Sequence, residues 1–392
     1  MTVIAGELRV GRWAWKVLAM CALLPGATVA QIAEKTEMPA NAVVLQVHSY
    51  GRVEKVAGGM YTYQWPGVYF LAAYHGPALY FRVGSGRQNL HILADGHSSR
   101  IVLDGQAGIY RIATPKGATH LVRIDVMNEN QDGPKSLGEF LVEGTGKNTL
   151  FDTSGRQMEF IGDSYTVGYG NTSTSRYCTS DQVWATTDTT QSVGADLALH
   201  YNANYQINAI SGRGVVRNYN GGTGNTVPVA YPFTLLNEQS LYRDPAWMPS
   251  VVAISLGTND FSTSLHATEA WKTRDDLHAA FVDTYFNFIK SLRSQYPRAL
   301  IVLWSTDEMH GEIAEQGQMV VQKLHIAGDP RVDFVDVTGL AFSGCHQHPS
   351  FTDDSLIAAR LMSDIDTHHD VWLPKVKGTS TTRTPASSAP MP

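Results

Sequence analysis

Hydrophobic residues alternate with other residues between about positions 43 and 144. In segments 78–83 and 121–126 every second residue is apolar, which is the period of a strand with one buried face. Short turn sequences separate such runs: Gly58-Gly59, Gly84-Ser85-Gly86, Asp95-Gly96 and Asp104-Gly105. Several short strands at this spacing predict a β-sandwich of jelly-roll-like type.

From about residue 150, short and mainly apolar runs alternate with helical stretches instead. The runs are 158–161, 249–256, 300–304 and 332–337. One helical stretch places five residues on a single face and is ended by Pro297: Leu277, Phe281, Thr284, Phe288 and Leu292. Strands that alternate with helices predict a parallel sheet with helices on both faces, which is a three-layer α/β fold.

These changes of pattern divide the chain into four parts. We expect a signal peptide at 1–30, the sandwich at 31–148, the α/β domain at 149–374 and a disordered tail at 375–392. The tail is rich in Lys, Thr, Ser and Pro, a composition that does not support a packed core.

The N-terminus has the three regions of an export signal. Basic residues come first, segment 17–24 is apolar, and small residues lead to Ala30, after which cleavage is expected. An uncleaved anchor helix is the alternative. Lipidation of Cys21 is not favoured, because Met20 before it fits a lipoprotein signal poorly. The expected location is therefore the periplasm or the outside of the cell.

The composition argues against two classes of protein, those that bind nucleic acid and those that span a membrane. Charged residues make up 17% of the chain and the formal net charge is -6, so no basic field attracts nucleic acid. No run after residue 31 is apolar enough to span a bilayer.

Removal of the signal leaves two cysteines, Cys178 and Cys345, and an exported protein with one such pair invites a disulfide. Spacing alone does not settle that pairing. No heptad or sequence repeat points to an oligomer, so a monomer is expected.

The first candidate for chemistry is Gly162-Asp163-Ser164, directly after a buried strand. A serine at a strand-to-helix turn is exposed at the carboxyl end of the sheet. Its own N–H then lies at a helix N-terminus, where it can stabilise an anion. Such tripeptides also form ordinary turns, so this signal is weak by itself.

Two other segments predict hydrogen-bond donors at the same sheet edge. Asn259 follows the strand in 249–256, and its side chain offers an amide. Gly212 lies in a glycine-rich exit from a further strand and presents its N–H without side-chain obstruction. An Asx turn and a plain tight turn are the respective alternatives.

The fourth segment runs from Gly344 to Ser350 and precedes a helix over 353–361. His348 in this segment is far from the serine in sequence but can fold back as a general base. Taken alone, such a histidine is more often structural or solvent-exposed.

In this order, the four segments resemble the four conserved blocks of SGNH (GDSL) hydrolases over about residues 156–366. The resemblance implies Ser164 as nucleophile and His348 as base. It also implies an oxyanion hole made by the N–H groups of Ser164 and Gly212 and the Asn259 side chain. Asp163 and Asp260 are expected to anchor their turns. No cofactor is implied.

The whole mature chain resembles the acetyl esterases of carbohydrate esterase family two. The matching features are a sandwich ahead of the hydrolase domain, the run from Ser211 to Tyr219 and the Gly-Cys-x-x-His-Pro sequence ending at Pro349. The segments around Trp65, Asp95-Gly96 and His120 are similar to the sandwich of that family. The resemblance implies removal of acetyl esters from plant-wall sugars such as xylan and glucomannan.

The chain departs from the SGNH pattern near the base. Where many members carry an aspartate three residues before the histidine, this chain has Cys345, and where some relatives have one two residues before it, this chain has His346. We therefore expect a backbone carbonyl to hold His348. Asp353 or Asp354 is the alternative, although both are better explained as acids in the first turn of a helix.

Two further patterns have ordinary structural explanations. His346, His348 and the pair His368-His369 are ligand types for a metal, but no cysteine or carboxylate of ligand spacing joins them, so we expect no metal site. Trp304, at a strand end, is either a sugar platform or part of the core.

The sequence thus predicts an exported deacetylase of oligo- or polysaccharides that works through an acyl-serine intermediate. Its substrate is expected where the sandwich and the α/β domain meet. A general SGNH lipase or thioesterase is one alternative, and an inactive carbohydrate-binding protein is another.

Overall fold

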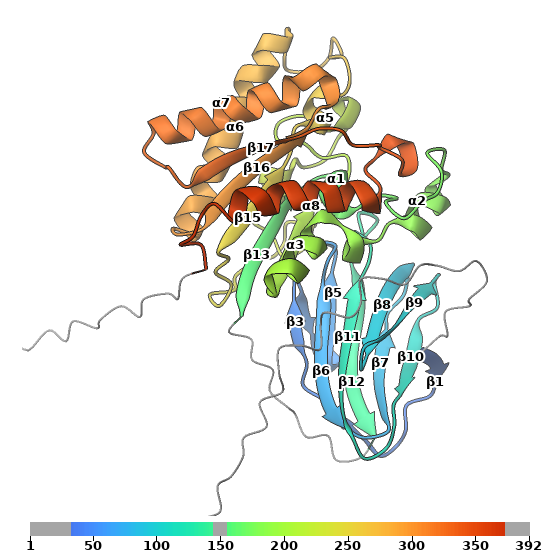
Figure 1. The fold of residues 1–392 in the computed structure, drawn as a ribbon. Coiled ribbons are helices and arrows are strands. Elements are labelled where there is room, and N and C mark those ends of the chain that lie inside the picture. Colours follow the sequence, from blue (N-terminus) through green and yellow to red (C-terminus); the bar gives the residue numbers. More distant parts are fainter. Residues whose placement is uncertain (1–32, 144–154, 373–392) are drawn as a thin grey trace, which may run out of the picture.

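The computed structural model describes residues 33–143 and 155–372 (Figure 1). The expected signal peptide, the domain boundary near residue 148 and the expected tail lie outside the described residues. In the described part of the chain, no helix combines the length and the apolar character needed to cross a bilayer.

Within residues 33–143, twelve strands form the N-terminal domain. They are β1 (Ala33–Thr36), β2 (Ala42–Val44), β3 (His48–Tyr50), β4 (Glu54–Val56), β5 (Met60–Tyr63), β6 (Tyr69–His75), β7 (Ala78–Val83), β8 (Gln88–Ala94), β9 (His97–Leu103), β10 (Gly108–Ala113), β11 (Thr119–Val126) and β12 (Lys135–Glu143), with a 3-10 turn η1 (Ala57–Gly59). One antiparallel sheet has the order β1-β10-β7-β12-β5-β4 with β2 also on β12, and the other has the order β3-β6-β11-β8-β9. The apolar faces of both sheets share one core, as predicted for a sandwich.

The alternating pattern predicted the inner face of this domain better than its outer face. Val122, Ile124 and Val126 are buried in the core as expected. On β7, however, Ala78 and Tyr80 of the other face are buried as well. They pack against Ile109 and the segment before β2, which covers this side of the sheet. The domain also starts earlier than the predicted pattern, because β1 pairs with β10.

The second domain is built on a parallel sheet of order β14-β13-β15-β16-β17. Its strands are β13 (Arg156–Gly162), β14 (Ala203–Ala209), β15 (Val251–Ser255), β16 (Leu300–Thr306) and β17 (Val332–Val337). Its helices are α1 (Ser164–Val167), α2 (Ser180–Thr186), α3 (Val193–Tyr201), α4 (Val227–Ala230), α5 (Thr258–Phe261), α6 (Arg274–Gln295), α7 (Glu312–Ile326) and α8 (Phe351–Ile365). Four 3-10 turns complete it: η2 (Thr189–Gln191), η3 (Tyr219–Gly221), η4 (Glu308–Gly311) and η5 (Cys345–Gln347).

Helices cover both faces of the parallel sheet, as predicted. The pair α3 and α8 packs on one face, and the pair α6 and α7 on the other (Figure 1). All residues of β15 and β16 are buried, which explains their continuous apolar runs. Helix α6 begins at a capping box of Thr273 and Asp276 and buries the predicted residues Leu277, Phe281 and Phe288.

The two domains share buried contacts rather than meeting only at a surface. Arg52 of the sandwich is 1% exposed and lies 3.7 Å from the fully buried Glu159 of β13. Its guanidinium also stacks 4.2 Å above the ring of Tyr231 and donates to the carbonyl of Phe233 at 3.0 Å. A charge buried in this way needs its partners in place, so the sandwich is held in a fixed position against the α/β domain.

Candidate active site

Ser164 begins helix α1 at the carboxyl end of the central strand β13. Asp163 caps this helix by accepting the N–H of Tyr165 at 3.1 Å. The cap turns the chain sharply, so that the Ser164 side chain faces the space above the sheet edge. There its Oγ lies 2.9 Å from Nε2 of His348. The structure therefore brings together the predicted nucleophile and the predicted base.

A backbone carbonyl fixes the tautomer of His348. Its Nδ1 lies 3.0 Å from the carbonyl oxygen of Cys345, which can only accept a hydrogen bond. The ring proton therefore sits on Nδ1, and Nε2 carries the lone pair that faces Ser164. Burial lowers the pKa of His348 to about 4, so the imidazole is neutral at pH 7 and able to take a proton.

Two tyrosines that sequence reasoning did not single out enclose the imidazole. The ring of Tyr169 lies over it with centroids 4.4 Å apart, and Tyr165 meets it edge-on at 5.4 Å. Both belong to the turn that starts at Ser164, so one segment carries the nucleophile and the walls of the slot for the base. Hydrophobic periodicity describes local structure only, so it carries no information about a contact between segments that lie about 180 residues apart in the sequence.

Two backbone N–H groups are available above the sheet edge. Within the described residues, the N–H groups of Ser164 and Gly212 donate to no protein acceptor. Gly212 has φ +80°, and a Cβ there would meet nothing within 4 Å, so the glycine is required by its backbone conformation rather than by space. The parallel pairing of β13 and β14 aligns Gly162 with Ala209, which places both groups at the same edge.

Asn259 lies at this edge too, but its donors have partners. Its Nδ2 donates to Oδ2 of Asp163 at 3.0 Å and to the carbonyl of Arg213 at 2.9 Å. An amide carries only two hydrogens, so a bond from Asn259 to an oxyanion requires it to share or exchange one of these. Asn259, the expected third donor, therefore lies at this edge, but both hydrogens of its amide are already used in these two hydrogen bonds.

The aspartates of the site shape its turns, as expected. Asp260 accepts the N–H groups of Val215, Val216 and Arg217, each at 2.9 Å, and so holds the loop that follows Gly212. Burial raises the pKa of Asp163 to about 7 and that of Asp260 to about 6.

The helix α8 acids are engaged elsewhere. Asp353 closes a capping box with Ser350, and Asp354 accepts a hydrogen bond from Asn171 at 2.9 Å. In the described structure the polar partners of His348 are Ser164 and the Cys345 carbonyl, so neither acid orients the imidazole.

The structure contains a disulfide between Cys178 and Cys345. Cys345 also supplies the carbonyl that holds His348, and His346 beside it donates its N–H to Arg176 at 2.7 Å. Gly170 gives the disulfide its space, because a Cβ there would lie 2.4 Å from that of Cys345. The Cys178–Cys345 disulfide thus fixes the loop that carries His348.

Replacing both cysteines by serine should lower the free energy of unfolding by about 5 kcal/mol, because the bridge closes a loop of 167 residues and restricts the unfolded chain. Urea unfolding under oxidising conditions measures the difference. As a control, the double variant is unfolded in urea with and without reductant. Its urea midpoint should be the same in both, because it has no disulfide to reduce. An unchanged urea midpoint would contradict the prediction.

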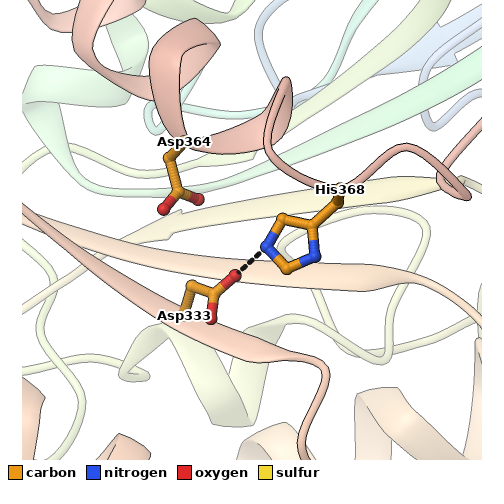
Figure 2. Close-up of side chains that lie close together, drawn as sticks. All are labelled: Asp333, Asp364 and His368. Carbon is orange, nitrogen blue, oxygen red and sulfur yellow. Dashed lines mark ion pairs between the residues drawn. The ribbon is translucent and has the colours of Figure 1, made fainter.

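One cluster of possible metal ligands lies apart from the dyad. Figure 2 shows Asp333 of β17, Asp364 of α8 and His368 with ligand atoms within 4.8 Å of one another. His368 Nε2 is paired with Asp333 at 2.5 Å. Burial, with a smaller effect of the neighbouring Asp333, raises the pKa of Asp364 to about 6. The pair joins the end of α8 to β17, and His346 and His348 belong to no such cluster within the described residues.

Other residues singled out from the sequence are structural. Trp304 is 3% exposed and belongs to the core, so it is no sugar platform. In the sandwich, Trp65 is fully buried and His120 is hydrogen-bonded to Asp95.

A loop of the sandwich reaches the candidate oxyanion site and was not predicted to do so. Glu129 accepts the N–H of Ser211 at 2.9 Å, and Gln131 donates to the carbonyl of Ser211 at 3.0 Å. Burial raises the pKa of Glu129. The signal available in the sequence was a dense run of amide and carboxylate side chains over 128–132, directly after a strand.

Comparison with known families matches both domains. Residues 49–150 match the carbohydrate esterase 2 N-terminal family, and residues 160–368 match the GDSL-like lipase/acylhydrolase family. The chain is 39% identical over 313 residues to an acetylxylan esterase / glucomannan deacetylase of Cellvibrio japonicus, covering 80% of this chain and 87% of that protein.

Solved structures agree with this assignment. A carbohydrate esterase whose active site is described as having divergent catalytic and non-catalytic binding functions matches with a TM-score of 0.78 and 39% identity, over 84% of this chain and all of that chain. A family two carbohydrate esterase from Clostridium thermocellum in complex with cellohexaose matches with a TM-score of 0.73 and 26% identity, over 83% of this chain and 100% of that chain.

Proposed function

Because this chain belongs to carbohydrate esterase family two and is therefore a carboxylic ester hydrolase, we propose that it removes O-acetyl groups from plant-wall oligo- and polysaccharides such as xylan and glucomannan. The observation that carries this proposal is the contact of 2.9 Å between Ser164 Oγ and His348 Nε2, with the opposite ring nitrogen held by a carbonyl. Such a pair can activate a serine without a cofactor.

The proposed reaction proceeds through an acyl-serine intermediate. Ser164 Oγ attacks the acetyl carbonyl carbon while its proton passes to Nε2 of His348. The free N–H groups of Ser164 and Gly212 stabilise the oxyanion. Collapse of the tetrahedral species breaks the ester bond, and His348 returns the proton to the leaving sugar oxygen. Water, deprotonated by His348, then attacks the carbonyl carbon of the acetyl-serine. The bond from this carbon to Ser164 Oγ breaks, His348 returns the proton to Oγ, and acetate is released.

The junction of the domains supports a carbohydrate substrate. A cavity of ≈ 400 Å³ lies beside Arg213, between the sandwich and the α/β domain. Its lining combines apolar residues, among them Pro134, Ile210 and Leu236, with amide and carboxylate side chains: Gln64, Gln131, Asp132, Asn225, Asn237 and Glu238. Such groups suit sugar hydroxyls, whereas a long acyl chain prefers an apolar groove.

We also propose that the protein acts in the periplasm or outside the cell. The basic, apolar and small-residue regions of segment 1–30 support export. The Cys178–Cys345 disulfide supports an oxidising compartment, because cytosolic thiols are kept reduced.

The substrate class is tested by acyl-chain preference. We expect acetate release from acetylated xylan and glucomannan, and turnover of 4-nitrophenyl acetate at least ~10-fold faster than that of the butyrate or octanoate, since a site built for an acetyl group has little room for added methylenes. Initial rates of purified protein on each ester measure this. Faster turnover of octanoate would favour a lipase or thioesterase, and sugar binding without turnover would favour a binding protein.

A further inference from the structure

The loop between β11 and β12 of the sandwich lies against the catalytic domain. Its first residue, Met127, accepts the N–H of Thr189 at 3.1 Å, and Asn128 donates to the carbonyl of Trp184 at 3.0 Å. On the sandwich side, Asn130 and Gln64 exchange hydrogen bonds of 2.9 and 3.1 Å. Contacts to both domains therefore fix the backbone that carries Glu129 and Gln131.

The side chains of Glu129 and Gln131 form hydrogen bonds with both backbone groups of Ser211, its N–H and its carbonyl. Glu129 Oε2 accepts the Ser211 N–H, and Gln131 Nε2 donates to the Ser211 carbonyl. Gln131 Nε2 also lies 3.2 Å from Glu129 Oε2. Because both neighbours of this nitrogen are acceptors, the side-chain amide of Gln131 must present its NH₂ end here.

The carbonyl that Gln131 contacts belongs to the peptide whose N–H is that of Gly212. A trans peptide is planar, so its C=O and N–H point in opposite directions. Holding the Ser211 oxygen therefore fixes the direction of the Gly212 N–H. This matters because Gly212 has φ +80° and no side chain whose packing could fix this peptide plane. The Tyr219 N–H, which donates to Gly212 at 2.9 Å, holds the carbonyl of the next peptide.

We propose that Gln131 and Glu129, both from the sandwich domain, are positioning residues of the oxyanion hole that clamp the Ser211–Gly212 peptide so that its N–H points at the reacting carbonyl. The proposal rests on the proposed function, which uses this N–H in the hole. The sandwich then contributes to the chemical step and does not merely shape the cleft.

The clamp predicts an effect on turnover and not on substrate affinity. Gln131→Glu keeps the size of the side chain but removes its donor. On 4-nitrophenyl acetate, which has no sugar to meet the cavity that Gln131 also lines, we expect kcat to fall roughly 10-fold to 100-fold at pH 8, with KM within about twofold. A misdirected Gly212 N–H loses its hydrogen bond to the oxyanion, and that bond forms mainly in the transition state. Inactivation by ethyl 4-nitrophenyl methylphosphonate, which places an oxygen in the hole, should slow by a similar factor.

A pH profile separates the clamp from a purely structural role. Glu129, whose pKa is raised by burial, faces position 131 in both proteins, so each rate of Gln131→Glu is divided by the native rate at the same pH. A protonated Glu at position 131 can again donate, so this deficit should narrow between pH 8 and 5. Gln106→Glu, the same change in the exposed turn between β9 and β10, is the matched control and should behave as the native protein. Thermal unfolding of both variants should occur at the native temperature.

The outcomes distinguish this inference from the proposed function. A kcat of Gln131→Glu within twofold of native, with Ser164→Ala inactive, overturns the clamp and leaves the esterase. A rise in KM at unchanged kcat also overturns it, because Gln131 would then bind substrate. Full activity of Ser164→Ala would instead remove the proposed function on which the clamp rests.

Discussion

Replacing Ser164 by alanine should reduce kcat for acetate release by at least ~10⁴-fold, because the proposed acyl intermediate cannot form without its oxygen. The remaining rate would come from binding and from the N–H groups of Ser164 and Gly212, which the substitution leaves in place. Initial rates on 4-nitrophenyl acetate and acetylated xylan measure the loss. The side chain is 5% exposed and removal of one oxygen opens little space, so the fold should persist.

A matched control strengthens this test. Ser173→Ala removes a hydroxyl from the same region of the chain, where it donates to the carbonyl of Ser175 at 2.8 Å and lies 3.4 Å from Cys178 Sγ. It should retain activity within about twofold. If Ser164→Ala were as active as Ser173→Ala, the assignment of the nucleophile would be wrong.

The domain types could be predicted because each follows from local periodicity. Runs such as 332–337 are mainly apolar and bounded by turns, and the strand β17 has these same limits. The outer face of β7 could not be predicted, because its burial depends on Ile109 and on the segment before β2, which are distant in sequence. Alternation reports which face meets the core, but it carries no information on what later covers the other face.

The candidate site was predictable as far as it follows from the parallel sheet. Ser164, Gly212 and Asn259 each stand after a strand, and the carboxyl ends of parallel strands meet at one edge. The carbonyl expected to hold His348 is that of Cys345, because a short 3-10 turn folds this residue back onto the imidazole.

What the sequence did not predict depends on contacts between domains or between distant segments. Glu129 and Gln131 reach Ser211 only because buried groups such as Arg52 fix the sandwich against the α/β domain. The partners of Asn259 likewise depend on how two loops meet. Side-chain hydrogen bonds of this kind are set by tertiary packing and have no periodic signature.

Replacing His348 by alanine should lower kcat by about 10⁴-fold, because Ser164 then loses the acceptor for its proton. The variant should also leave an open slot between the rings of Tyr165 and Tyr169, which lie 5.4 and 4.4 Å from the imidazole centroid. Added imidazole fits this slot and should restore part of the rate in proportion to its concentration. His325→Ala, which removes a histidine bonded to the Val332 carbonyl, is the control that should show no such rescue.

The pH dependence of rescue tests the role of burial in tuning this base. A base acts in its neutral form, so protonation of His348 should reduce the native kcat/KM tenfold per pH unit only below its pKa of about 4. Free imidazole titrates near the ordinary histidine value of about 6.5, so the rescued rate of His348→Ala should already fall below that pH. A native acid limb near 6.5 that persists in Asp163→Asn and in Asp260→Asn would show that burial does not depress the pKa of His348, because these two aspartates titrate in the same range. An absence of rescue together with an unchanged native limb near 4 would mean that the tyrosine slot closes when the ring is removed.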